Sequence, residues 1–189
     1  MRILAAPRRT LSKTLAAPVV VAACALALAG PAAGSSGRVT QYNSLEPAVV
    51  AKINETRASR GLARLRVAPR LLNAATRHAN SMGTGGYFSH DLLTSGGYKP
   101  FSSWIRSYWP GPGYRSWSAG ENLFCATYAP SARGVVRAWM GSAPHRANLL
   151  NRRWRSVGVA AVRVGSWSGA FQGCAGNVTL VAAEFGRRS

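Results

Sequence analysis

Few side chains in this 189-residue chain can do acid–base or metal chemistry. The chain has three histidines, His78, His90 and His145, and only five acidic residues against 24 lysines and arginines. Neutral imidazoles and a carboxylate are ligands that zinc and other borderline metals accept. The chain has no His-Glu-x-x-His run that would place two ligands on one helix, so the fold would have to assemble a metal site from distant segments.

Other catalytic arrangements are poorly supported by the same residues. A paired-carboxylate glycosidase would have to use Glu121 with Asp91, because the other acidic residues fall in a predicted helix and a predicted strand. Ser89 and Ser142 each lie close to a histidine in the chain, but neither sits in a Gly-x-Ser-x-Gly turn. His78 lies near the apolar face of a predicted helix, which favours a histidine at the edge of the core over a ligand.

Two amphipathic helices are predicted in the first part of the domain, and the second contains His78. Leu45, Val49 and Ile53 recur at helical spacing, and Gly61 would end this first helix. Pro69 would open the second helix in its first turn. The apolar face of the second helix consists of Leu71, Leu72, Ala75, Ala79 and Met82, and it would end at Gly83, Gly85 and Gly86.

The remainder of the chain predicts both strands and short helices. Residues 91–116 are rich in Gly, Pro and Ser and predict a long loop with one short helix at 100–108. Residues 156–164 and 178–185 predict two strands that form a hairpin around a loop at 165–176. We also expect a strand at 116–124, a helix at 130–141 and a helical turn at 145–150. Helices combined with antiparallel strands favour an α+β layered domain.

The first 33 residues predict a secretory signal peptide, followed by a linker at residues 34–44. A basic stretch precedes an apolar run at 15–29, and small residues follow it. This run is shorter than the ~20 residues that a membrane-spanning helix needs. Arg8-Arg9 resembles a twin-arginine export signal, and Val21-Ala22-Ala23-Cys24 resembles a lipoprotein cleavage box, although the residues after Cys24 stay apolar. We expect cleavage near Ala33.

Removal of this leader leaves 20 basic and 5 acidic residues, a net charge of +15. The arginines cluster at residues 57–70, 152–155 and 187–188, and a basic surface of this kind binds phosphates nonspecifically. Because the chain has a leader and no nucleic-acid-binding motif, we expect anionic envelope polymers or lipid headgroups as partners rather than nucleic acid. The alternative is a solvated face that binds nothing.

Two cysteines, Cys125 and Cys174, follow the leader. An even number of cysteines in an exported domain favours a disulfide, and two buried free thiols are the alternative.

Several segments, in order, resemble the CAP superfamily in its bacterial form. This superfamily comprises cysteine-rich secretory proteins, antigen 5 and pathogenesis-related proteins, and its domain is also called the SCP domain. Each segment is weak evidence alone, but the ordered set spans residues 45–186. The resemblance implies an α+β fold for residues 45–189, a three-layer α-β-α sandwich with a small antiparallel sheet. The segments are Ile53–Arg57 with Gly61-Leu62, Leu72–Ala79 with Met82, Tyr87–His90, Ala119–Leu123, Val135–Met140 with Ser142, Pro144–Leu150 and Val157–Ala160.

The resemblance also implies a polar cleft, which in the family holds two histidines and two acidic residues. It places His90, Glu121 and His145 there, with Asn122 beside Glu121. Ser142 stands where plant and animal members have the second glutamate. No cofactor is required, but His90, Glu121 and His145 are the residues that would hold a divalent cation such as zinc.

Family members that bind sterols or fatty acids suggest a role for the aromatic residues at 98–117, either as a wall for an apolar ligand or as anchors for their own loop. We therefore predict a secreted, non-enzymatic binding module whose cleft takes a small apolar ligand, a cation or an envelope component. One alternative is a metal-assisted hydrolase acting on extracellular peptide or cell-envelope substrates. Another is an envelope-associated structural protein held by its arginine clusters. No residue is assigned a catalytic role.

Overall fold

The structure, a computed structural model, describes residues 37–189 except for the side chain of residue 170. The predicted signal peptide at residues 1–33, with its twin-arginine and Cys24 motifs, lies outside the described residues. Within residues 37–189, no helix is both long enough and apolar enough to cross a membrane.

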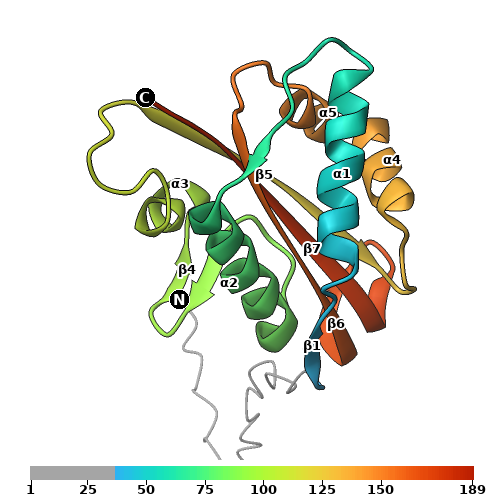
Figure 1. The fold of residues 1–189 in the computed structure, drawn as a ribbon. Coiled ribbons are helices and arrows are strands. Elements are labelled where there is room, and N and C mark those ends of the chain that lie inside the picture. The colour runs from blue at the N-terminus through green and yellow to red at the C-terminus, as the bar shows by residue number, and fades with distance from the viewer. Residues whose placement is uncertain (1–36) are drawn as a thin grey trace, which may run out of the picture. The chain divides into compact units, whose positions relative to one another are not determined.

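A five-stranded sheet forms the middle layer of the fold (Figure 1). Four strands follow the order β1-β6-β7-β5 and pair antiparallel, while the short strand β2 pairs in parallel with β6. Strand β5 therefore lies at one edge of the sheet. The strands are β1 (Val39–Gln41), β2 (Arg66–Val67), β5 (Trp117–Ala126), β6 (Ser156–Phe171) and β7 (Cys174–Arg188).

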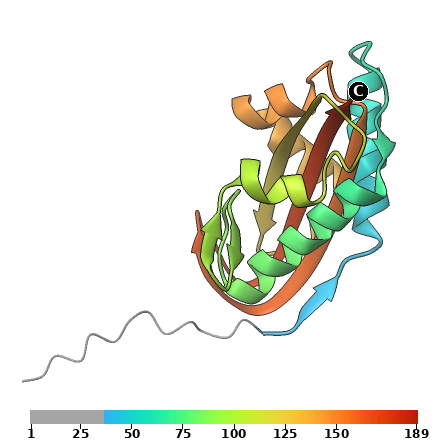
Figure 2. The ribbon, with the colours of Figure 1, turned by 90° about the vertical axis from the view of Figure 1, so that its left-hand side faces the viewer.

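Helices cover both faces of this sheet, which confirms the predicted α-β-α sandwich. One face packs against α1 (Leu45–Ala58), α4 (Ala132–Gly141) and α5 (Ala143–Leu149). The other face, turned to the viewer in Figure 2, packs against α2 (Pro69–Gly85), with α3 (Phe101–Trp104) and the 3-10 helix η1 (Ile105–Ser107) beside it. A separate hairpin of β3 (Leu92–Thr94) and β4 (Gly97–Lys99) lies next to α2.

The apolar sequence of β6 explains why its sheet is covered on both sides. Successive side chains of a strand point to opposite faces. Val157 and Val159 pack in the core cluster of α1, α4 and α5, whereas Ala160 and Val162 pack in the cluster of α2. Both faces of β6 are thus apolar, and both must be buried by a helical layer.

Helix α2, which carries His78, approaches the sheet closely. It begins at Pro69, and at its other end the N–H of the left-handed Gly86 donates to the carbonyl of Met82. A Cβ atom on Gly158 of β6 would overlap the backbone of Leu71 and Leu72, so only glycine permits this contact.

Three predicted loops proved to be partly strand. The segment 165–176 is not a loop, because β6 continues to Phe171 and β7 starts at Cys174, with register shifts on either side of Trp167. The loop predicted at 91–116 contains the β3–β4 hairpin, and the linker predicted at 34–44 contains β1. These strands are short or irregular, and their pairing depends on tertiary contacts that leave no alternating pattern in the sequence.

The predicted disulfide between Cys125 and Cys174 is confirmed. It links the end of β5 to the start of β7 across 49 residues of sequence. The bond therefore fixes the edge strand over which the cleft described below is built.

Candidate functional site

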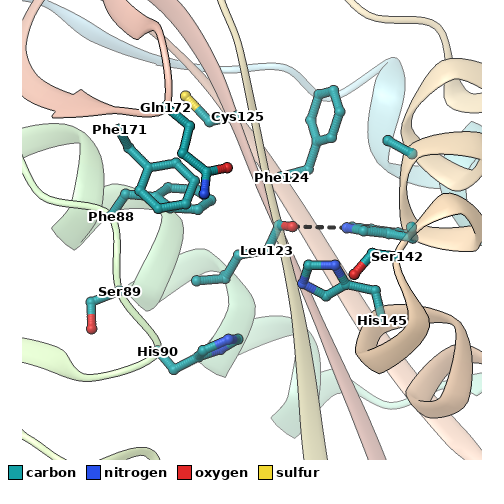
Figure 3. Close-up of a pocket in the computed structure, with 12 residues that line it drawn as sticks. Phe88, Ser89, His90, Leu123, Phe124, Cys125, Ser142, His145, Phe171 and Gln172 are labelled. Carbon is teal, nitrogen blue, oxygen red and sulfur yellow. Dashed lines mark hydrogen bonds between the residues drawn. The ribbon is translucent and has the colours of Figure 1, made fainter.

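A cleft lies over the edge strand β5, with one histidine on each side of the strand. His90 comes from the segment between α2 and β3, and His145 comes from α5 (Figure 3). Both residues line two hollows, one of about 520 Å³ and one of about 360 Å³, so the imidazoles mark the boundary between two lobes of a single cleft. Ser142 lines the larger lobe, and Glu121 and Asn122 line the smaller one. The structure thus brings all five cleft residues indicated by the family resemblance together.

Glu121 is the centre of a buried hydrogen-bond network. Its Oε1 lies 2.6 Å from Nδ1 of His78, and its Oε2 lies 2.5 Å from Nδ1 of His90. Only 1% of the Glu121 side chain is exposed. Because an ionised carboxylate can only accept hydrogen bonds, both Nδ1 atoms must donate. Burial alone would raise the pKa of Glu121, but the bonds from His78 and His90 outweigh it and hold the pKa below its ordinary value.

Glu184 is a second buried carboxyl group in this network. It lies directly opposite Glu121 in the pairing of β5 with β7. Burial, followed by the charge of Glu121, raises the pKa of Glu184 well above its usual value. As a carboxylate, Glu184 would have no hydrogen-bond donor for either oxygen within residues 37–189. The raised pKa favours the neutral, protonated form of Glu184, which can donate a hydrogen bond to Glu121.

The pKa values of the two cleft histidines are shifted in opposite directions. The hydrogen bond to Glu121 raises the pKa of His90, against the opposing effect of its partial burial. Burial lowers the pKa of His145, and the charge of His90 lowers it further. Near neutral pH, therefore, His90 is the imidazole that more readily carries a positive charge, while His145 stays neutral.

Asn122 holds α5 against β5. Its Nδ2 donates to the carbonyl of His145 at 3.0 Å, and its Oδ1 accepts from Asn148 at 3.0 Å. On the next residue, the carbonyl of Leu123 accepts from the indole N–H of Trp139 in α4 at 2.8 Å (Figure 3). These bonds fix His145 relative to the strand, so the buried Asn122 positions the cleft rather than presenting its amide to a ligand.

The predicted metal ligands were His90, Glu121 and His145. Both oxygens of Glu121 are already bonded to imidazoles, so its role in the structure is to orient His90 and not to bind an ion directly. A carboxylate behind a histidine is a common arrangement around metals. The atoms left to bind a cation in the cleft are Nε2 of His90 and the imidazole of His145.

His78 does not behave as the core-edge residue that the sequence indicated. It is completely buried and bonds directly to Glu121. Within residues 37–189, the potential ligand atoms that gather within 4.8 Å belong to His78, Glu121 and Glu184. The bond between His78 Nδ1 and Glu121 is formed, whereas Nε2 of His78 and both oxygens of Glu184 are buried without a hydrogen-bond partner among the described residues.

The larger lobe has an aromatic wall that the sequence did not reveal. The rings of Phe88 and Phe171 lie 4.4 Å apart, and Phe124 and Trp139 line the same cavity. Phe171 could not be identified because its segment was predicted as a loop. Phe88 lies two residues before His90, so its position next to a cleft residue was the one indication of this wall in the sequence.

The aromatic residues of the predicted loop have other places. Trp104 and Trp109 are buried anchors, Tyr98 and Tyr114 are exposed, and Phe101 lines the smaller lobe of the cleft. Most of this loop is therefore held by its aromatic residues rather than forming a wall for the cleft.

Comparison with known proteins gives a consistent result. The sequence pattern of the Cysteine-rich secretory protein family (CAP) matches residues 50–180. The uncharacterized protein YkwD of Bacillus subtilis is 33% identical over 135 residues, which cover 71% of this chain and 49% of that protein. The chain thus spans about half the length of this curated relative.

Two solved structures share the fold. One is an extracellular protein containing a SCP domain from Bacillus anthracis, with a TM-score of 0.55 and 23% identity over 76% of this chain and 40% of that one. The other is an outer surface protein from Borrelia burgdorferi, with a TM-score of 0.61 and 20% identity over 81% of this chain and 99% of that one.

Proposed function

Because this chain belongs to the cysteine-rich secretory protein (CAP) family, we propose that it is a secreted binding module whose cleft holds a small ligand without converting it. The observation that carries this proposal is the cavity of about 520 Å³, which joins an aromatic wall to two imidazoles. Cavities of this size with mostly apolar walls and a few polar groups are typical of small-molecule sites.

One end of this cavity is apolar and the other is polar, and this combination indicates the class of ligand. Phe88, Phe171 and Trp139 would hold an apolar body. His90, whose pKa is raised by Glu121, favours an anionic head group, and the neutral His145 can donate a further hydrogen bond. A fatty acid combines these two features, and a sterol supplies the apolar body with a hydroxyl head.

Binding is better supported than hydrolysis. The family requires no cofactor. Among the described residues that line the two lobes, Glu121 is the only carboxylate, and both of its oxygens accept bonds from imidazoles. A buried carboxylate with a lowered pKa is a poor general base.

Export is supported independently of the cleft. Disulfides persist in oxidising compartments outside the cytosol, and Cys125–Cys174 is such a bond. The solved relatives are an extracellular protein and an outer surface protein.

The experiment is to titrate the purified protein with oleate and with cholesterol and to measure binding by isothermal titration calorimetry. We expect saturable binding of at least one, weakened about tenfold by Phe171→Ser because the ligand loses its apolar contact with an aromatic ring. Tyr128→Ser is the matched control, since Tyr128 is an exposed aromatic residue that does not line this cavity. If neither probe binds, or if both variants behave alike, the proposal fails. Stoichiometric zinc, with peptide hydrolysis that His90→Ala and His145→Ala abolish, would replace it with the metal-assisted hydrolase.

A second candidate, attachment to an anionic envelope polymer, is supported by the convergence of three arginine-rich segments. The N–H of Arg66 donates to the carbonyl of Arg155, and the N–H of Arg155 donates to Gly186, so the segments meet at the upper end of the molecule in Figure 1. None of these segments contains an acidic residue. We call this surface the arginine end; its exposed members are Arg60, Arg64, Arg66, Arg70, Arg152, Arg153, Arg155 and Arg187.

Arg57, which the sequence grouped with this cluster, is not part of the surface. It is buried, and its guanidinium donates to the carbonyls of Ala63, Leu149 and Asn151. Arg57 thereby links the loop after α1 to the loop after α5. Both loops carry arginines of the arginine end, so this buried residue holds them together.

Polyphosphate is a suitable probe for the arginine end. We expect its binding to weaken with salt, and the double variant Arg152→Gln/Arg153→Gln to reduce the slope of log K against log salt by about 2. Arg133→Gln/Arg137→Gln removes the same charge from α4 and should leave a steeper slope than the first variant. Equal slopes for the two variants would mean that the arginine end is a solvated surface and not the binding site for the polymer.

A further inference from the structure

A second cavity lies on the α2 side of the molecule and shares no lining residue with the cleft. Its volume is about 500 Å³, and we call it the Trp104 pocket. It is enclosed by α2, the β3–β4 hairpin, α3 and η1. Its lining residues are Arg77, Leu92, Thr94, Lys99, Pro100, Ser103, Trp104, Ser107 and Tyr108.

Two positive charges of this pocket are uncompensated. Arg77 and Lys99 are exposed, and neither side chain has a hydrogen bond or an ion pair with any part of the chain from 37 to 189. The acid nearest to them in the chain, Asp91, instead accepts the backbone N–H of Phe101 at 3.3 Å. A guanidinium and an ammonium in one hollow form a site for an anion, because no carboxylate neutralises them.

Hydroxyl groups line the same pocket as these charges. The hydroxyls of Ser103, Ser107 and Tyr108 line the pocket without a hydrogen-bond partner among the described residues. Thr94 differs, because its hydroxyl already donates to the carbonyl of Gly97. Two cations and three free hydroxyls exceed what a carboxylate with two oxygens can use, and they suit the three terminal oxygens of a phosphate monoester.

Trp104 forms part of the floor of the pocket and is held in place from behind. Trp104 is 3% exposed, and its indole N–H donates to the carbonyl of His90 at 3.0 Å. Its ring also lies 4.9 Å from the ring of His78 and packs edge-on against Tyr108. The half-buried ring of Tyr108, packed against the fixed Trp104, offers most of the accessible aromatic surface, and it can receive a ring with little loss of conformational freedom.

We propose that the Trp104 pocket binds a small phosphate monoester that carries a ring, with the phosphate on Arg77 and Lys99 and the ring against Trp104 and Tyr108. The charges specify the phosphate, and the aromatic floor specifies the ring. This site is separate from the cleft, although Trp104 contacts residues of the cleft network from the other side.

The test is to titrate the ¹⁵N-labelled protein with phenyl phosphate and to monitor the chemical shifts by NMR. We expect saturable shifts of the Trp104 indole N–H and of the amides of β3 and β4. Arg77→Gln/Lys99→Gln should weaken binding by at least about tenfold, because two charge-assisted contacts are lost. Lys52→Gln/Arg137→Gln, which removes one lysine and one arginine from α1 and α4, should bind like the wild type. The dispersion of each spectrum shows whether the variant is folded.

Two further probes separate the parts of the ligand. Inorganic phosphate lacks the ring and benzyl alcohol lacks the charge, so each should bind more weakly than phenyl phosphate. Equal affinity for inorganic phosphate, shifts confined to the arginine end, or equal binding by the two double variants would each overturn the proposal. Shifts confined to residues that line the cleft, with none in β3 or β4, would place the phosphate in the cleft and also overturn the proposal.

Discussion

At the scale of single residues, the cleft depends on how protons are shared around Glu121. This carboxylate accepts from His78 and His90, and the raised pKa of Glu184 favours a neutral form that can act as a third donor to the same buried charge. Each donor lowers the cost of burying that charge. The same arrangement orients His90 and gives it its raised pKa, which is why the buried side chains matter for any ligand in the cleft.

Replacement of Glu184 by glutamine tests whether this residue is protonated. The raised pKa means that the folded state keeps a proton that the unfolded state releases above about 4.5, so wild-type stability falls as the pH rises through this window. Glutamine cannot ionise but can still donate an N–H to Glu121. Glu184→Gln should therefore match the wild type near pH 4 and gain about 1.4 kcal/mol per pH unit above it, up to the folded pKa.

Thermal unfolding at a series of pH values measures this difference. Glu55→Gln is the control, because Glu55 is exposed and pairs only with Lys52. A constant difference between Glu184→Gln and the wild type across this range would mean that Glu184 is ionised in the folded protein.

Replacement of Glu121 by glutamine should change the two cleft histidines in opposite directions. The hydrogen bond to Glu121 is the main cause of the raised pKa of His90, so that pKa should fall. His145 then loses part of the repulsion from a charged His90, and its pKa should rise. We also expect a loss of about 3 kcal/mol of stability, because a buried hydrogen-bonded charge is removed.

The chain has only three histidines, so their NMR titrations can be resolved and assigned. His78→Gln provides a comparison in which the bond between Glu121 and His90 remains. If the pKa of His90 in Glu121→Gln stays where it is in the wild type, Glu121 does not control the charge of the cleft.

At the scale of elements, the position of α2 determines where His78 lies. The backbone of Leu71 and Leu72 rests against Gly158, and there is no room for a Cβ atom between them. Gly158→Ala should therefore push α2 away from β6 and cost about 2–3 kcal/mol. Denaturant unfolding measures this loss directly.

Gly134 is the matched control, because its replacement by alanine should raise the free energy of unfolding instead of lowering it. It lies in α4, and the nearest atom to an added Cβ would be Oγ of Ser131 at 3.5 Å. Gly134→Ala should stabilise the protein by about 0.5–1 kcal/mol, because alanine restricts the unfolded chain and favours the helix. A loss of stability at both positions, or at neither, would contradict the close-contact account of Gly158.

The sequence predicted regular elements better than it predicted their contacts. Leu45, Val49 and Ile53 follow the helical period, so α1 was predictable, and Pro69 and Gly86 mark the ends of α2. The order of the family motifs supplied His90, Glu121 and His145. The network behind them was not predictable, because His78 and Glu184 reach Glu121 across 43 residues and through a strand register that only the folded sheet defines.

At the scale of the whole molecule, charge is the dominant feature. The described residues contain 20 lysines and arginines against five acidic residues. Two of those acids, Glu121 and Glu184, are buried, and a third, Glu55, pairs with Lys52. The positive charges on the surface therefore repel one another, and we expect this repulsion to be strongest at the arginine end, where three arginine-rich segments meet. Folding brings these charges closer together than they are in the unfolded chain, so the repulsion destabilises the folded state.

Salt should stabilise this protein. Screening shortens the reach of surface charges from about 30 Å at 0.01 M to about 8 Å at 0.15 M salt. We expect the midpoint of thermal unfolding at pH 7 to rise by several degrees, roughly 5 °C, over this range. Arg152→Gln/Arg153→Gln removes two of the crowded charges, so this variant should start from a higher midpoint and gain less from salt than Arg133→Gln/Arg137→Gln. A midpoint that falls as salt is added would mean that attractive ion pairs outweigh the repulsion, although Lys52–Glu55 is the only ion pair between a lysine or arginine and an acid within residues 37–189.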